Sequence, residues 1–238
     1  MTYSLLSLVL PCYRQADQVP DIVQECVSVL EKVPLRSEIL LVPNGPADGT
    51  AESCRREAER RPQVRVIEGS AGWGGAVRSG IEASDGDLVC FTNSARTSPE
   101  DLLLVLLYAT AYPGVVVKAT RRTRDNWRRR LGSVLYNLEC RALFDLPNFD
   151  VNGTPKVFPR DHQALLTLEH SDDLLDVEFA VVCRRMGYPM LEVPIVSTGR
   201  RGGASTTNYR SAWRMYTGAL RLWNDLREER PCSTPTTN

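Results

Sequence analysis

A cluster of glycines in the first half of this chain is the first feature that suggests chemistry, because glycine-led helix starts bind phosphate through backbone N–H groups. The cluster reads Gly69-Ser-Ala-Gly72-Trp-Gly74-Gly75. A dinucleotide-binding pattern starting at Gly72 requires glycine or alanine where the chain has Val77, and a phosphate loop requires Lys-Ser or Lys-Thr after its last glycine. The cluster satisfies neither pattern. It favours a tight entry into a helix that packs closely on a sheet.

A run of basic residues offers a second kind of anion site. Seven cations fall within thirteen positions: Lys118, Arg121, Arg122, Arg124, Arg128, Arg129 and Arg130. Three interpretations stay open, namely a solvated helix face, a site for an acceptor phosphate, and contact with an anionic membrane, where each nearby cation contributes about 1 kcal/mol. Nucleic acid is disfavoured, because no aromatic stacking platform accompanies the charges and 29 acidic residues balance 29 basic ones.

The sequence contains no metal-ligand or disulfide pattern. His162 and His170 lack the spacing of metal ligands, and the seven cysteines are scattered without a CxxC pair, so buried, reduced thiols are expected. The longest apolar run, 102–109, is far shorter than the roughly 20 residues that cross a bilayer, and residues 1–10 lack the positive start of a signal peptide. The prediction is a cytoplasmic protein, soluble or peripheral to a membrane.

The elements that must position these residues follow from apolar runs that alternate with helical patterns. Strands are predicted at 5–10, 38–42, 64–67, 87–92 and 115–119, and helices between them at 19–31, 50–60, 72–84 and 98–109. This β-α-β-α order predicts an α/β fold with a mainly parallel central sheet flanked by helices. With 42% hydrophobic and 24% charged residues, the 238-residue chain can bury the core of such a domain.

The second half of the chain is less regular. It predicts helices at 125–144, 161–169, 173–187 and 208–228, with short strands within 150–158 and at 191–196. Residues 231–238, rich in proline, threonine and serine, are expected to be a disordered tail. Sheets of this class bind ligands at the carboxyl ends of their strands, so a site is expected in the loops after residues 10, 42, 67, 92 and 119.

Five segments, in order along the chain, match the motifs of one enzyme family. They are Ser7-Leu-Val-Leu-Pro-Cys-Tyr13, Leu40-Leu-Val-Pro-Asn-Gly-Pro-Ala-Asp-Gly-Thr50, Gly72-Trp-Gly-Gly-Ala-Val-Arg-Ser-Gly80 with Ser84-Asp-Gly-Asp87, Asp150-Val-Asn-Gly153 with Lys156-Val-Phe158, and Glu192-Val-Pro-Ile195 with Arg200 and Gly203-Ala-Ser205. The chain resembles glycosyltransferase family 2, in particular its dolichol-phosphate mannose synthase and polyprenyl-phosphate glycosyltransferase branch. The resemblance implies a GT-A-type nucleotide-sugar-binding fold in a single domain over 1–230, with a nucleotide-sugar-binding half (1–120) and an acceptor and catalytic half (121–230).

Departures from the family pattern bear on the metal and on the base. Where the family carries Asp-x-Asp after its fourth strand, this chain has Asn93-Ser94-Ala95, a degenerate version of the motif. Divalent cations such as Mg²⁺ prefer charged oxygen ligands. The sequence therefore predicts a metal-independent enzyme without a cofactor, in which protein cations neutralise the leaving diphosphate. The family's paired aspartates are Pro43-Asn44 here, and Asn44 is expected to read the base through its amide.

The resemblance also implies roles for individual residues. The donor-binding set is Pro11, Tyr13, Asn44, Gly72, Gly74, Asn93, Ser94 and Ala95. The phosphate-binding set is Arg96, Arg121, Lys156, Arg200 and Ser205, in which arginine is favoured because its planar fork matches phosphate oxygens. Asp176 lies at the family's position for the catalytic base, with Glu178 as the second choice, because carboxylates two apart on a helix point in different directions. The alternative is that both acids only complement the helix dipole.

These roles predict an inverting glycosyltransferase that uses a nucleotide-diphosphate sugar, with UDP-sugars favoured over GDP-sugars. A soluble small molecule is the first choice of acceptor. One alternative is a peripheral polyprenyl- or dolichyl-phosphate sugar synthase that contacts the membrane through 118–130 and 209–226. The other is a non-catalytic sugar-nucleotide-binding protein. A lipid phosphate is already anionic and needs no general base, so the choice of acceptor decides whether Asp176 is catalytic.

Overall fold

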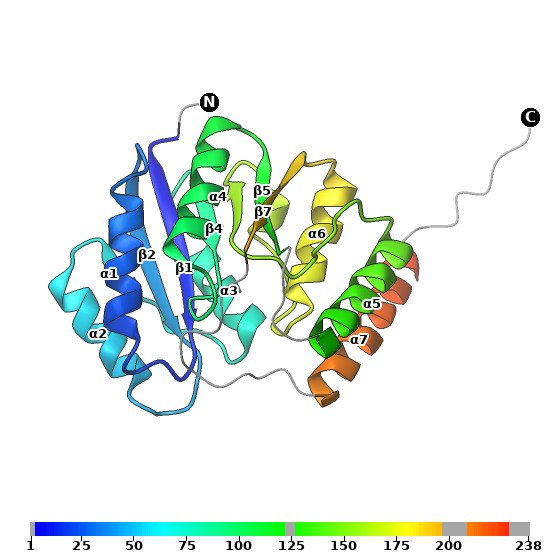
Figure 1. The fold of residues 1–238 in the computed structure, drawn as a ribbon, viewed down its shortest axis with the longest axis horizontal. Helices are drawn as coiled ribbons and strands as arrows, with labels where there is room; N and C mark the ends of the chain where they lie inside the picture. Colours follow the sequence, from blue (N-terminus) through cyan, green and yellow to red (C-terminus); the bar gives the residue numbers. More distant parts are fainter. Residues whose placement is uncertain (1–2, 122–126, 197–208, 229–238) are drawn as a thin grey trace, which may run out of the picture.

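The chain folds around one seven-stranded sheet in the computed structural model, which describes residues 3–121, 127–196 and 209–228 (Figure 1). The first half alternates strands and helices as predicted. Its elements are β1 (Leu5–Cys12), α1 (Val19–Leu30), β2 (Arg36–Pro43), α2 (Thr50–Arg60), β3 (Val64–Val66), α3 (Trp73–Glu82), β4 (Leu88–Phe91) and α4 (Pro99–Ala111). Ser98 caps α4 as its sequence suggests, because its Oγ accepts a hydrogen bond from the Asp101 N–H at 3.1 Å.

The second half contains the elements β5 (Val116–Arg121), α5 (Trp127–Phe144), β6 (Lys156–Pro159), η1 (Gln163–Leu165), α6 (Leu175–Met186), β7 (Met190–Ile195) and α7 (Tyr209–Glu228). The helix predicted at 161–169 is wrong, since only the single 3₁₀ turn η1 forms there. Its leucines mimic helical spacing, but Leu165 and Leu168 pack into the core beneath α6 while Glu178 holds the backbone of 169–170.

The sheet has the strand order β3-β2-β1-β4-β6-β5-β7. β6 runs antiparallel to β4 and β5, whereas the remaining pairs are parallel. The predicted mainly parallel sheet flanked by helices is therefore confirmed. The carboxyl ends of β1, β2, β4 and β5 and the start of β6 consequently share one edge of the sheet, which is where the predicted site residues lie.

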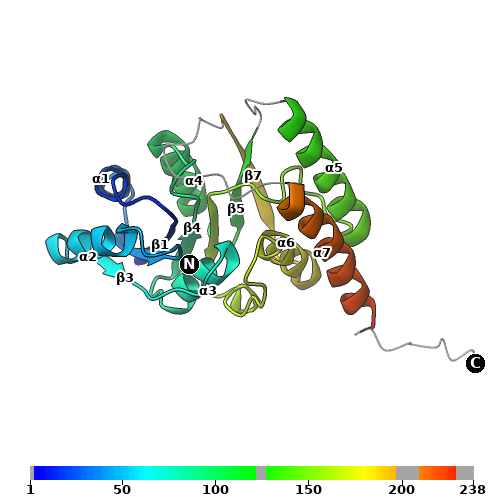
Figure 2. The same cartoon turned by 90° about the horizontal axis from the view of Figure 1, so that it is seen from below.

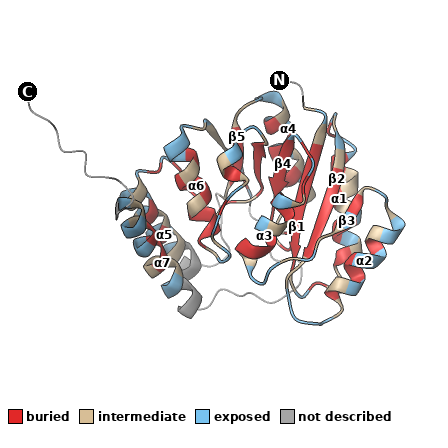
Figure 3. Cartoon of the chain, turned by 180° about the vertical axis from the view of Figure 1, so that it is seen from behind, coloured by how far each residue is buried: buried red, intermediate tan, exposed pale blue. Residues whose placement is uncertain are grey.

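Successive side chains of each strand point to opposite faces of the sheet, so they pack into two separate hydrophobic cores. Leu8 of β1 packs with residues of α1 and α4, while its neighbour Val9 packs with α3 and α6. Figure 2 shows α4 and α3 on opposite sides of β4, and Figure 3 shows the strands buried between the helical layers. A third core, which includes Tyr136 and Cys140, joins α5 to α6 and α7 beyond the sheet.

Six cysteines lie in the described part of the chain, and all six are buried and form no disulfide there: Cys12, Cys26, Cys54, Cys90, Cys140 and Cys183. The expectation of buried, reduced thiols is met for these six. In the same described residues, none of the helices combines the length and the apolar character needed to span a bilayer.

Candidate active site

The predicted donor-binding residues of three strands meet at the carboxyl edge of the sheet. β1 and β2 end in register, with Cys12 opposite Pro43, and the Asn44 N–H donates to the Cys12 carbonyl at 3.1 Å. Ser94, after β4, places its Oγ 2.9 Å from the Pro11 carbonyl and 2.8 Å from Oε1 of Gln15. Neutral hydrogen bonds therefore hold Pro11, Asn44 and Ser94 in one cluster.

Asn44 is oriented by the glycine segment that precedes α3. Its Nδ2 donates to the Gly72 carbonyl at 3.0 Å. Its Oδ1 is buried and accepts no hydrogen bond from any residue in the described ranges. A buried amide oxygen without a protein donor is costly unless a ligand supplies one, so this atom is suited to accept an N–H from a bound base.

The glycines themselves serve a close approach between α3 and the segment 170–172. A Cβ on Gly74 would lie 2.6 Å from the Asp172 carbonyl oxygen, and one on Gly72, whose φ is +90°, would lie 2.8 Å from that of Ser171. The Gly75 N–H donates to the Ser171 carbonyl at 2.8 Å. The interpretation of the cluster as a tightly packed helix entry is confirmed, and donor binding by Gly72 and Gly74 stays a prediction.

Glu178 fixes the other side of that contact. Its carboxylate accepts hydrogen bonds from the backbone N–H groups of Glu169 and His170, at 2.7 and 2.9 Å, and lies 3.0 Å from His170 Nδ1. Burial acts to raise the pKa of Glu178, but these hydrogen bonds lower it on balance, and the same contact raises the pKa of His170. Glu178 thus holds the 169–172 segment against α3.

Asp176 points in the other direction, to a fully buried lysine. Lys156, at the start of β6, donates from Nζ to Asp176, and its ammonium lies 5.6 and 5.2 Å from the ring centres of Phe91 and Phe179. Burial lowers the pKa of Lys156, although Asp176 acts to raise it. The carboxylate at the predicted position of the base is therefore committed to a buried ion pair.

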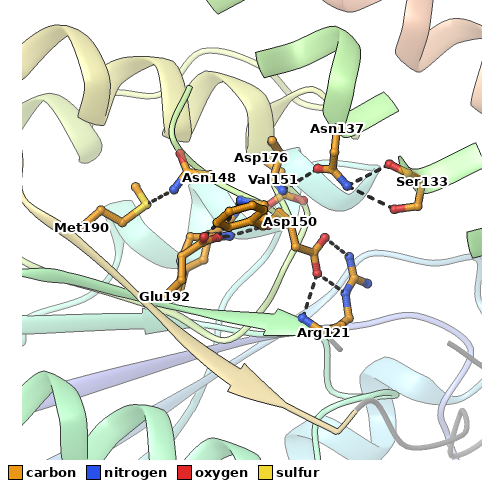
Figure 4. A network of polar contacts seen from close by, with 12 residues as sticks. Arg121, Ser133, Asn137, Asn148, Asp150, Val151, Asp176, Met190 and Glu192 are labelled. Carbon is orange, nitrogen blue, oxygen red and sulfur yellow. Dashed lines mark hydrogen bonds and ion pairs between the residues drawn. The ribbon is translucent and has the colours of Figure 1, made fainter. Parts of the chain in front are cut away.

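Arg121 ends β5 and is locked by a residue from the loop before β6 (Figure 4). Its Nε and Nη2 donate to the two oxygens of Asp150, both at 2.7 Å, and its backbone N–H donates to the same carboxylate at 3.2 Å. Such a bidentate pair fixes the plane of the guanidinium. The Arg121 side chain keeps 20% of its surface exposed, whereas Lys156 keeps none.

A second buried lysine supports the Asp150 loop from beneath. Lys118 of β5 donates to the Asp150 carbonyl and, at 2.9 Å, to Glu192 of β7. Glu192 also accepts the Phe149 N–H at 3.0 Å. Burial acts to raise the pKa of Glu192, but Lys118 holds it below its ordinary value. The loop that carries Asp150 is thus fixed by a charged pair that spans two parallel strands.

Sequence reasoning missed Asp150, Lys118 and Glu192 as members of this network. A lysine inside the apolar strand 115–119 was the available signal, because such a residue must find a partner when buried. Two predicted phosphate-binding residues, Arg200 and Ser205, lie outside the described residues. Arg96 is half-buried directly after the 93–95 segment, with its N–H donating to the Asn93 carbonyl at 3.0 Å.

The residues at 93–95 do not fit a divalent ion. Asn93 Oδ1 accepts the Ala95 N–H at 3.1 Å, and Ser94 Oγ is engaged as described above. Across the described ranges, no three His, Cys, Asp or Glu side chains gather as a metal site. These oxygens are neutral and already used, whereas hard cations need charged oxygen ligands.

Solved structures with the same architecture define the fold. Mannosyl-3-phosphoglycerate synthase from Rubrobacter xylanophilus aligns with a TM-score of 0.72 and 22% identity, over 99% of this chain and 79% of that one. Glucosyl-3-phosphoglycerate synthase from Mycobacterium tuberculosis, crystallised with Mn²⁺, UDP and phosphoglyceric acid, aligns with a TM-score of 0.69 and 16% identity, over 97% and 80%. The chain has the GT-A glycosyltransferase fold.

The sequence comparisons identify the family. The model for "Glycosyl transferase family 2" matches residues 7–163. An undecaprenyl-phosphate 4-deoxy-4-formamido-L-arabinose transferase of Edwardsiella ictaluri is 30% identical over 141 residues, 57% of this chain and 43% of the relative. A protein of the same name from Pseudomonas syringae pv. syringae is 30% identical over 52% of this chain and 38% of its own length. The chain belongs to glycosyl transferase family 2, and it spans less than half the length of these relatives.

The expectation that no divalent metal is required is corrected by these findings. Solved structures of the same fold contain Mn²⁺ together with UDP. Metal independence was predicted from Asn93-Ser94-Ala95 alone, although a metal site can include residues outside this segment. Ligands to such an ion can come from the bound diphosphate and from other parts of a chain, so three residues do not decide a metal requirement.

Proposed function

We propose that this glycosyltransferase transfers a sugar from a nucleotide-diphosphate donor to the phosphate of a polyprenyl-type lipid. The observation that carries the proposal is the ion pair between Asp176 and the fully buried Lys156. This acceptor replaces the soluble small molecule expected first from the sequence. It agrees with the names of the curated relatives, which are undecaprenyl-phosphate sugar transferases.

A general base is needed for some acceptors and not for others. Transfer to a hydroxyl requires a group within hydrogen-bond reach that takes its proton. Asp176 is paired with Lys156, and Glu178 is occupied by two backbone N–H groups and His170. A phosphate oxygen carries its own negative charge and needs no base. The geometry of both predicted carboxylates therefore favours a phosphate acceptor.

In the proposed reaction an acceptor phosphate oxygen attacks the anomeric carbon of the sugar from the face opposite the leaving group. The bond from that carbon to the nucleoside diphosphate breaks, the diphosphate departs with the electron pair, and the configuration inverts. Arg121 lies at the sheet edge and keeps part of its side chain exposed, so it faces the phosphate groups in this scheme. Lys156 and Asp176 position the start of α6 and keep the charge of that region balanced.

The donor side of the proposal rests on Asn44. Its unpaired Oδ1 is suited to accept the N3–H of uracil while its Nδ2 stays on the Gly72 carbonyl. UDP is the nucleotide found in the solved Mycobacterium tuberculosis enzyme of the same fold. UDP-sugars are therefore the first donors to test.

The test is an acceptor panel with the full chain. Release of nucleoside diphosphate from UDP- and GDP-sugars is measured with a polyprenyl phosphate, the matching polyprenol, and 3-phosphoglycerate, with and without Mn²⁺. The proposal expects turnover with the polyprenyl phosphate and none with the polyprenol. Turnover with the polyprenol, or with 3-phosphoglycerate alone, would overturn it.

One observation favours a second candidate, transfer to a hydroxyl of a soluble acceptor. Asp173 lies just before α6, and burial together with the nearby Asp176 raises its pKa, as expected for a general base. The solved relatives of the fold are named as synthases of sugar-phosphoglycerates. Under this candidate Asp173→Asn abolishes turnover, whereas under the lipid-phosphate proposal it leaves the rate within about threefold, because no proton is taken.

A further inference from the structure

The solvent face of α5 is apolar. Leu131, Val134, Leu135 and Leu138 retain 52, 56, 50 and 61% of their surface exposed. Their spacing of three, four and seven residues places them along one side of the helix. Figure 3 shows this helix at the outer edge of the molecule, with exposed residues on its free side. We call these four residues the α5 stripe.

The α5 stripe lies on a different side of the helix from the residues of α5 that pack into the core. Tyr136 and Cys140 already fill the core shared with α6 and α7, and the Asn137 side chain accepts the Val151 N–H at 2.8 Å. α5 is therefore apolar on both sides, although only one side is packed. Contiguous exposed apolar surface of this kind marks a binding face, because a soluble protein gains nothing by presenting it to water.

The charges of α5 indicate what covers the stripe. By sequence the helix holds four arginines, Arg128, Arg129, Arg130 and Arg141, against one acid, Glu139. Arg141 is exposed, whereas Oε2 of Glu139 is buried and burial raises the pKa of that carboxyl. A helix with an exposed apolar face and an excess of positive charge in its sequence matches an anionic bilayer surface, into which the apolar side chains insert while cations meet headgroups.

A second helix provides the contrast. α4 also exposes leucine, with Leu104 at 38% and Leu107 at 42%. Its sequence, however, contains two acids, Glu100 and Asp101, and no lysine or arginine. An anionic membrane would repel that end of α4. The combination of exposed apolar side chains and excess positive charge is therefore specific to α5 among these two helices.

We infer that the α5 stripe docks this enzyme on an anionic membrane, and this inference deepens the proposed lipid-phosphate acceptor on which it rests. The same helix reaches the site, because Asn137 holds Val151 next to Asp150, and Asp150 holds Arg121. A bilayer seated on α5 would thus present its phosphate headgroups near the end of β5. The surface differs from the predicted contacts at 118–130 and 209–226, since its apolar part begins at Leu131.

The experiment measures co-sedimentation of the full chain with vesicles of phosphatidylcholine alone and with about 30% phosphatidylglycerol. We expect binding only to the anionic vesicles. Leu135→Asp with Leu138→Asp is expected to weaken binding at least about tenfold, because even half-burial of each leucine changes a partition constant several-fold. The milder Leu138→Gln is expected to weaken it by a smaller factor. Leu107→Asp on α4 is the matched control and should bind like the unchanged protein.

Each other outcome overturns the inference. Equal binding of the Leu135→Asp, Leu138→Asp variant, or equal losses with Leu107→Asp, would exclude the α5 stripe. A concentration-dependent dimer that the stripe substitutions dissociate, without vesicle binding, would assign the stripe to a second copy of the chain. Thermal unfolding of each variant shows whether it is folded. Turnover of a short, detergent-dispersed polyprenyl phosphate separates the two proposals, because it tests the acceptor without a bilayer.

Discussion

The two sides of the site are held in different ways. On the proposed donor side, neutral hydrogen bonds join the ends of three strands: Ser94 after β4 donates to the Pro11 carbonyl of β1, and Asn44 after β2 donates to the Cys12 carbonyl of β1. On the acceptor side, three ion pairs do the same work: Lys156 with Asp176, Arg121 with Asp150, and Lys118 with Glu192. Removing one partner of a neutral hydrogen bond costs less than removing one partner of a buried ion pair, because the second change leaves an uncompensated charge. The acceptor side should therefore be the fragile one.

The largest expected effect is the loss of Lys156. Replacing Lys156 with Met leaves Asp176 buried without its partner and should lower the free energy of unfolding by about 3–5 kcal/mol, measured by urea denaturation. The double variant Lys156→Met, Asp176→Leu should recover most of that loss, because neither charge is then left alone. Ser94→Ala is the donor-side match and should cost only about 0.5–1.5 kcal/mol. Equal losses for Lys156→Met and Ser94→Ala would remove the distinction between the two sides.

An intermediate effect is expected where α3 meets the 170–172 segment. Gly74→Ala puts a methyl group 2.6 Å from the Asp172 carbonyl and should cost about 1–3 kcal/mol in unfolding free energy. Gly132→Ala in α5 is the control, since within the described residues an added Cβ meets nothing closer than 4 Å apart from its chain neighbours and its own helix backbone. That change should be neutral or stabilise by up to about 1 kcal/mol, as alanine favours helix. A neutral Gly74→Ala would mean that the segment moves away freely.

The smallest effect is the pH dependence of the contact between His170 and Glu178. The raised pKa of His170 gives stability that is present below about pH 6.5 and is lost as pH rises through the folded value. The lowered pKa of Glu178 gives stability that is present above about pH 4.5 and is lost as pH falls through the folded value. His170→Asn should thus lower the free energy of unfolding most near pH 5.5 and least above pH 8, by less than about 1 kcal/mol, measured by urea denaturation across this pH range. A loss that is constant from pH 5 to 9 would contradict the charged contact.

Much of the fold could be predicted from the sequence because the strands of the first half are buried on both faces. Continuous apolar runs such as 5–10 and 38–42 mark such strands without reference to the rest of the chain. The helix predicted at 161–169 is wrong because its leucines pack against α6 from an irregular segment, whereas the prediction placed them along one face of a helix. Local spacing does not distinguish these two arrangements.

The site was predicted in part for a similar reason. Arg121 and Lys156 could be placed because they adjoin predicted strands at the binding edge of the sheet. Their partners could not, since Arg121 meets Asp150 from 29 positions away and Lys118 meets Glu192 from 74. For Asp176 and Glu178, the sequence predicted only that the two side chains point in different directions. Which carboxylate meets a lysine and which meets a loop depends on the packing of β6 and α6.

The most direct test of the central claim is the chemical identity of the bond that the enzyme forms. Phosphorus-31 spectra of the lipid product, made from a polyprenyl phosphate and a UDP-sugar, distinguish a phosphate monoester from a diester. The proposed function predicts that the acceptor phosphorus becomes a diester, linked through oxygen to the anomeric carbon of the sugar. An acceptor that keeps its monoester phosphate and carries the sugar on a hydroxyl would contradict it.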